Sequence, residues 1–89
     1  MFLNKAYKGD IKAIQRYLKT DKGLINKQDY DSRTALHLAT AERHEHLVKF
    51  ILDQEGVRKD IKDRWKMTPL CEAKEHNDES MIELLVMPK

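Results

Sequence analysis

A repeat of 34 residues limits the possible folds of this sequence more than any other feature. Identical residues recur at this spacing, namely Asp29 and Asp63, Thr34 and Thr68, Leu36 and Leu70, and Ala39 and Ala73. A fixed period of this length is typical of stacked supersecondary units, each of which buries its apolar side against a neighbour. We therefore predict a single domain over residues 1–89, with repeats at about 2–28, 29–62 and 63–87. The stack amounts to about two and a half repeats, because the first one starts inside its first helix.

Each repeat is predicted to contain two short helices. Thr34 precedes the apolar run 35–39, and its hydroxyl can cap the free backbone N–H groups of a first helix. A second helix is expected to open at His44, because apolar residues follow at helical spacing: Leu47, Val48, Ile51 and Leu52. Hydrophobic residues make up 40% of the chain and charged residues 36%, which predicts a thin core under a solvated exterior.

The turn between the two helices must reverse the chain tightly, which favours a residue with positive φ. Gly9 and Asn77 stand at this position in the first and third repeats and adopt such a φ readily. Arg43 stands there in the second repeat, where a positive φ would cost about 1–2 kcal/mol. The second repeat is therefore predicted to be the strained one.

The balance of charge argues against a nucleic-acid partner, because the formal net charge is only +2. The charge is unevenly spread: residues 1–27 hold seven Lys/Arg and two acids, whereas residues 28–89 hold ten Lys/Arg and thirteen acids. This asymmetry either steers docking or is simply a solvated surface. The single cysteine, the lack of a long apolar run and a start without a targeting pattern predict a soluble intracellular protein without a membrane span.

Two short strings resemble the signature T-P-L-H-x-A of the ankyrin-repeat family: T-A-L-H-L-A at 34–39 and T-P-L-C-E-A at 68–73. The resemblance covers nearly the whole chain. It implies an all-α helix-turn-helix stack, in which a short β-turn finger precedes each antiparallel helix pair, and a role in binding other proteins.

A narrower resemblance lies in D-Y-D-S-R-T-A-L-H at 29–37 and in D-R-W at 63–65, which are similar to the C-terminal ankyrin domain of animal glutaminases. It implies a parent enzyme that hydrolyses glutamine in a separate serine-dependent domain, and hence a mitochondrial location. Plant kinases with ankyrin repeats share a similar pattern. The alternative is therefore an ankyrin module of an adaptor or signalling protein, or a small stand-alone binder, in the cytoplasm.

No catalytic, cofactor or metal site is predicted in the chain itself. Ser32 and Ser80 lie in different repeats without a neighbouring base, and Cys71 stands one period after His37, which indicates a packing position. The histidines lack the spacing of a metal site. His37 and His44 are expected to serve as buried hydrogen-bond partners between loops and helices.

The finger tips are the predicted partner-binding residues: Tyr30, Asp31, Ser32 and Arg33 on one finger, and Arg64, Trp65 and Lys66 on the next. Loops on a rigid frame often bind partners, and Trp, Tyr and Arg are the residue types that most often anchor interfaces. The alternative is structural: Trp65 folds down onto the neighbouring finger, and Arg33 pairs with Asp31 or Asp63.

Apolar residues at the two ends of the stack predict a further property. If they are exposed, they require covering by the rest of a longer chain, such as the other domains or subunits of a parent enzyme, or by self-association. These residues are Phe2, Leu3 and Ile11 at one end and Met81, Leu84 and Met87 at the other, where Pro88 is expected to stop the last helix.

Overall fold

The computed structural model describes residues 2–86, and within this range it contains helices and turns but no strand. The helices are α1 (Phe2–Lys8), α2 (Ile11–Thr20), the short 3₁₀ helix η1 (Lys22–Asn26), α3 (Ala35–Ala41), α4 (Glu45–Leu52), α5 (Pro69–Glu75) and α6 (Glu79–Val86). The all-α prediction is confirmed. None of the helices in the described range is long and apolar enough to cross a membrane.

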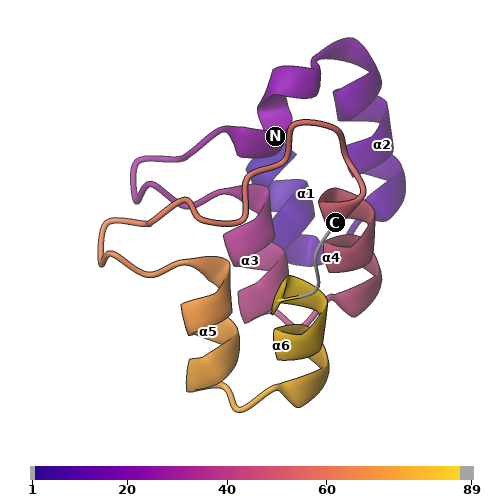
Figure 1. Ribbon diagram of the computed structural model, residues 1–89. Coiled ribbons are helices and arrows are strands. Elements are labelled where there is room, and N and C mark those ends of the chain that lie inside the picture. The colour runs from indigo at the N-terminus through magenta and orange to yellow at the C-terminus, as the bar shows by residue number, and fades with distance from the viewer. Residues whose placement is uncertain (1, 87–89) are drawn as a thin grey trace.

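The helices form three antiparallel pairs that stack side by side in two layers (Figure 1). Helix α3 packs between α1 and α5 in one layer, and α4 packs between α2 and α6 in the other. The two long loops that precede α3 and α5 project together to one side of the stack, on the left in Figure 1. The sequence period therefore corresponds to one helix pair and its loop.

The core lies between the two layers, and large apolar side chains from all three pairs fill it. Fully buried examples are Ile14, Leu36, Leu47, Ile51 and Met81. Each such side chain contributes about 1.5–3 kcal/mol by leaving water. The stripe predicted for α4 faces this core, where Leu47, Val48 and Ile51 are buried and Leu52 is half-buried.

The ends of the stack are less apolar than predicted. Phe2 and Leu3 are buried because α1 lies against α3, and the Phe2 ring also packs edge-on against Tyr17 at a centroid distance of 5.8 Å. Met81 is fully buried, and Ile11 and Leu84 are half-buried. The expectation of exposed apolar ends was therefore wrong at Phe2, Leu3 and Met81, while Met87 and Pro88 lie outside the described residues. Self-association stays a prediction.

The turns inside the helix pairs confirm the predicted backbone geometry. The φ angles are 76° at Gly9, 60° at Arg43 and 52° at Asn77, so Arg43 adopts the strained conformation. The next residue caps the following helix in the first and third pairs, whereas His44 makes no such cap. Its ring is half-buried and its Nε2 lies 2.8 Å from the Tyr7 carbonyl oxygen, which joins the first two pairs.

Candidate interaction surface

The two projecting loops are β-turn fingers, which we define as finger 1 (residues 27–33) and finger 2 (residues 60–67). In finger 1 the Ser32 N–H donates to the Asp29 carbonyl at 2.8 Å, and in finger 2 the Lys66 N–H donates to the Asp63 carbonyl at 2.9 Å. Both bonds close a four-residue β-turn. The last residue of each turn has a positive φ, 62° at Ser32 and 64° at Lys66. The short fingers implied by the family resemblance are thus confirmed.

An aspartate side chain organises each turn. Asp29 Oδ1 accepts hydrogen bonds from the N–H groups of Asp31 and Arg33, at 2.9 and 3.1 Å. One period later, Asp63 Oδ1 accepts bonds from the N–H groups of Trp65 and Met67, both at 2.9 Å. These carboxylates satisfy backbone donors that the turn would otherwise leave unpaired. Sequence analysis missed this role, although Asp29 and Asp63 form one of the identical pairs 34 residues apart.

Direct bonds join the two fingers into one surface. The Arg64 N–H donates to the Asp31 carbonyl at 2.9 Å, and the Arg64 guanidinium pairs with the Asp31 carboxylate at 3.1 Å. The Gln28 amide donates to the carbonyl of Ser32 at 2.7 Å and to that of Lys62 at 3.3 Å. The tips are therefore held relative to each other rather than moving as separate loops.

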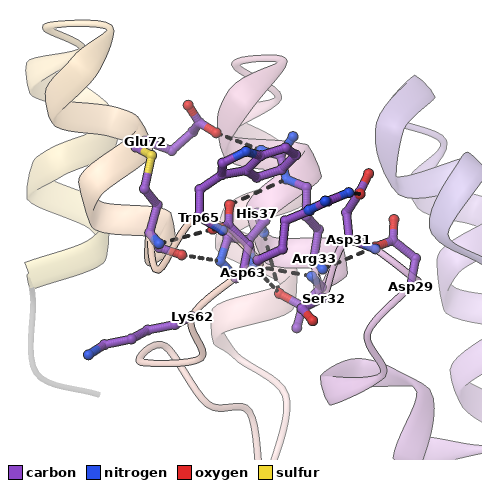
Figure 2. A network of polar contacts seen from close by, with 12 residues as sticks. Asp29, Asp31, Ser32, Arg33, His37, Lys62, Asp63, Trp65 and Glu72 are labelled. Carbon is purple, nitrogen blue, oxygen red and sulfur yellow. Dashed lines mark hydrogen bonds and ion pairs between the residues drawn. The ribbon is translucent and has the colours of Figure 1, made fainter.

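His37, labelled in Figure 2, joins finger 2 to the start of α3. It is fully buried at the start of α3, where its Nδ1 accepts a bond from the Thr34 N–H at 3.1 Å and the Thr34 hydroxyl caps the helix. Its Nε2 lies 2.9 Å from the Met67 carbonyl oxygen, which is satisfied when this nitrogen carries the proton. Burial lowers the pKa of His37, because the imidazolium would lose its water shell. The predictions for Thr34 as a cap and His37 as a buried link are confirmed.

Arg33 forms a second link between the second and third helix pairs. Its guanidinium lies 2.6 Å from the Glu72 carboxylate on α5 and 4.0 Å from Asp63. Of the two partners considered from the sequence, Asp63 is correct. Asp31 is wrong, because it pairs with Arg64 instead.

The exposed side chains at the tips are aromatic and basic. Tyr30 is 90% exposed and Trp65 59% exposed, and the Arg64 guanidinium lies over the Trp65 ring at 5.3 Å from its centroid. Trp65 thus stays on the surface, where a cation–π contact limits its freedom. Lys66 is exposed as well. Among the seven predicted tip residues, Asp31, Ser32 and Arg33 are instead half-buried within the network.

Neither a metal site nor a buried cysteine is present in the part of the chain that the structure describes. No group of three or more His, Cys, Asp or Glu within residues 2–86 could hold a metal ion. Cys71 is exposed, so its interpretation as a packing position was wrong. Finger 2 covers His37, but no described residue covers the same position one period later. A hydrogen bond from the Thr68 hydroxyl to the thiol, at 3.4 Å, lowers the pKa of Cys71.

Comparison with known proteins agrees with this geometry. A family model described as ankyrin repeats (3 copies) matches residues 2–89. This chain belongs to the ankyrin-repeat family. Ankyrin repeats are protein-interaction modules, whose stacked units present an extended binding surface.

This ankyrin module resembles parts of much longer proteins. It is 42% identical over 80 residues to the protein named glutaminase liver isoform, mitochondrial, of the mouse (Mus musculus). The matched stretch covers 90% of this chain and 13% of the mouse protein. It is 38% identical over 85 residues to serine/threonine-protein kinase VIK of Arabidopsis thaliana, covering 96% of this chain and 19% of the kinase. It is also 41% identical over 63 residues to the human (Homo sapiens) 26S proteasome non-ATPase regulatory subunit 10. This match covers 71% of this chain and 27% of the human protein.

Proposed function

We propose that this ankyrin module binds a protein partner through the tips of its two fingers, with Tyr30 and Trp65 as the anchors. The observation that carries the proposal is the exposure of both rings, 90% and 59%, on turns whose backbones are fixed by buried or half-buried carboxylates. A large exposed ring on a rigid loop can be buried by a partner at little cost in conformational entropy.

The predicted tip residues then divide into two roles. Tyr30, Arg64, Trp65 and Lys66 touch the partner, because their side chains are exposed. Asp31, Ser32 and Arg33 position the tips, because they are half-buried in bonds to the other finger and to α5. The module itself carries out no catalysis and needs no cofactor in this proposal.

The test of the binding surface replaces Trp65 with Ala. Loss of an anchor of this kind weakens binding by about 2 kcal/mol or more, a factor of roughly 30. Partner affinity is measured by interferometry on a partner captured with the wild-type chain, and Lys49→Ala on the exposed side of α4 is the matched control. The melting temperature should stay nearly unchanged. Unchanged affinity, or a large fall in melting temperature, would refute the anchor role.

We further propose that the parent protein is a glutaminase, which hydrolyses glutamine to glutamate and ammonia in another domain. The support is the 42% identity over 90% of this chain to a region that makes up 13% of the mouse glutaminase. In this proposal the module docks onto other domains or subunits of the enzyme or recruits partners to it, and the protein is mitochondrial.

A signalling parent in the cytoplasm is the second candidate, favoured by the 38% identity to the plant kinase over 96% of this chain. An antibody to residues 1–89 distinguishes the two when the native antigen is precipitated from source cells and weighed. A chain several times larger than 10.5 kDa, with glutaminase activity in the precipitate, supports the first candidate. A large antigen without that activity supports the second, and one near 10.5 kDa indicates a stand-alone binder.

A further inference from the structure

The end of the stack formed by α1 and α2 differs in chemistry from the equivalent side of the other two helix pairs. Helices α3 and α5 bury Ala39 and Ala73 at positions where α1 carries Lys5. Helices α4 and α6 pack Phe50 and Leu84 against the core where α2 carries Arg16. Two positions that are apolar in the second and third pairs are therefore cationic in the first. A helix pair that stacked on this side would have to supply partners for both charges.

A groove opens on this end, and we call it the end groove. It is lined only by residues of α1 and α2, namely Lys5, Ala13, Arg16, Tyr17 and Thr20. The Tyr17 ring packs edge-on against Phe2, and Ala13 is buried. The groove thus places the Tyr17 ring and Ala13 beside two cationic side chains, Lys5 half-buried and Arg16 exposed.

The basic side chains around the end groove have no acidic partners among residues 2–86. No lysine or arginine of residues 2–27 forms an ion pair with another residue in the described range, whereas Arg33, Arg43, Arg58 and Arg64 all do. The two acids of this region hold backbone N–H groups instead, Asp10 that of Ala13 and Asp21 that of Gly23. Residues 1–27 contain seven basic residues and only these two acids. Few carboxylates of this region would therefore compete with an external anion for the basic side chains.

We propose that the end groove is a second docking site, which binds an acidic segment of a protein partner. Carboxylates of the segment pair with Lys5 and Arg16, and its backbone or apolar atoms lie on Tyr17 and Ala13. Lys8, Lys12 and Lys19 are exposed on the same two helices and extend the positive field, which speeds the encounter.

A protein segment fits this surface better than a membrane or a nucleic acid. Residues 28–89 hold thirteen acids against ten basic residues, so an extended polyanion along the molecule would be repelled beyond the first helix pair. The groove is also confined to one end of a molecule 34 Å long. A short acidic segment can therefore bind there while the finger tips stay free for another partner.

The experiment measures the binding of a short fluorescein-labelled peptide of alternating glutamate and alanine, by fluorescence anisotropy with the full chain. Wild type is expected to bind, and to bind more weakly as the salt concentration rises from about 0.05 to 0.5 M. The double variant Lys5→Gln/Arg16→Gln is expected to lose at least about tenfold in affinity. Its circular dichroism should stay that of the wild type, because Arg16 is exposed, Lys5 is only half-buried and neither side chain forms an ion pair with a described residue.

The matched control is Lys49→Gln/Lys74→Gln, which removes the same charge from exposed lysines of α4 and α5. It should change the affinity less than about twofold. Equal losses in both double variants would overturn the proposal, since binding would then follow net charge alone. So would a loss in Trp65→Ala, because the peptide would then lie on the fingers. Binding to phosphatidylserine vesicles that depends on Lys5 and Arg16, without binding to the peptide, would assign the groove to a membrane instead.

Discussion

Replacement of Asp63 by Ala should remove a large part of the stability of this small stack. Asp63 is buried, its Oδ1 accepts bonds from the N–H groups of Trp65 and Met67 at 2.9 Å each, and its Oδ2 lies 4.0 Å from Arg33. The change leaves two backbone donors unpaired at the base of finger 2. It also removes one of the two carboxylates near the Arg33 guanidinium.

The size of the effect follows from these bonds. A hydrogen bond to a charged group contributes about 1.5–3 kcal/mol, and two bonds to one oxygen do not add fully, so about 3 kcal/mol is expected. A domain of 89 residues has a total stability of roughly 4–13 kcal/mol. With a urea slope near 1 kcal/mol/M, the unfolding midpoint should fall by about 3 M.

Two variants separate the contributions. Asp29→Ala removes the same pair of bonds from finger 1, at 2.9 and 3.1 Å, but Asp29 is only half-buried, so a loss of about 1.5 kcal/mol is expected. Asp63→Asn keeps an oxygen acceptor and should cost less than Asp63→Ala. Asp63→Ala is therefore expected to be the least stable of the three.

The assay follows urea unfolding by circular dichroism and by the emission of Trp65, which is the only tryptophan in the chain and lies on finger 2. Coincident transitions mean that the finger unfolds together with the helices, whereas an earlier change in emission means that the finger opens first. The reasoning fails if Asp63→Ala stays within about 0.5 kcal/mol of the wild type, or if Asp29→Ala costs more.

Two further predictions concern glycines and His37. Gly9→Ala should destabilise more than Gly56→Ala: both residues have positive φ, but an added Cβ would lie 2.8 Å from the His44 ring at Gly9 and would meet nothing within 4 Å at Gly56. Gly9→Ala should lose about 1–2 kcal/mol more stability than Gly56→Ala, because the hydrogen-bonded His44 ring must move. Equal losses of unfolding free energy for the two variants in urea denaturation would contradict this prediction. Acidification should also destabilise the stack, because burial holds the pKa of His37 below 6.5 in the folded state. The neutral ring stabilises fully above pH 6.5, and this contribution is lost as the pH falls below 6.5 towards the lower folded pKa. Melting temperatures from about pH 7.5 to 5.5 measure the loss, and His37→Gln should flatten this dependence.

The helices and inner turns were predictable from the sequence because local rules govern them. The cap at Thr34, the apolar stripe of α4 and the positive φ at Arg43 each follow from spacing and backbone preference over a few residues. The period of 34 then placed the helix pairs side by side without any need for long-range information.

The inner structure of the fingers was not predictable in the same way. Tyr30, Asp31, Ser32 and Arg33 are neighbours in the sequence, yet only Tyr30 points fully into solvent. Arg33 turns towards Glu72, which lies 39 residues further on, and Asp31 is held by Arg64. Similarly, Phe2 and Leu3 looked like an exposed end because the packing of α1 on α3 is a tertiary contact.

The links between the second and third helix pairs have a consequence for grafting repeats. His37 and Arg33 hold the following unit through Met67 and Glu72, but one period later the same two positions carry Cys71 and Met67. The outer side of α5 and α6 therefore lacks the coupling groups that make the preceding junction specific. A copy of residues 29–62 placed after α6 would meet a surface that lacks these two linking side chains. A further unit on this side would therefore need Cys71→His and Met67→Arg before links of the same kind could form.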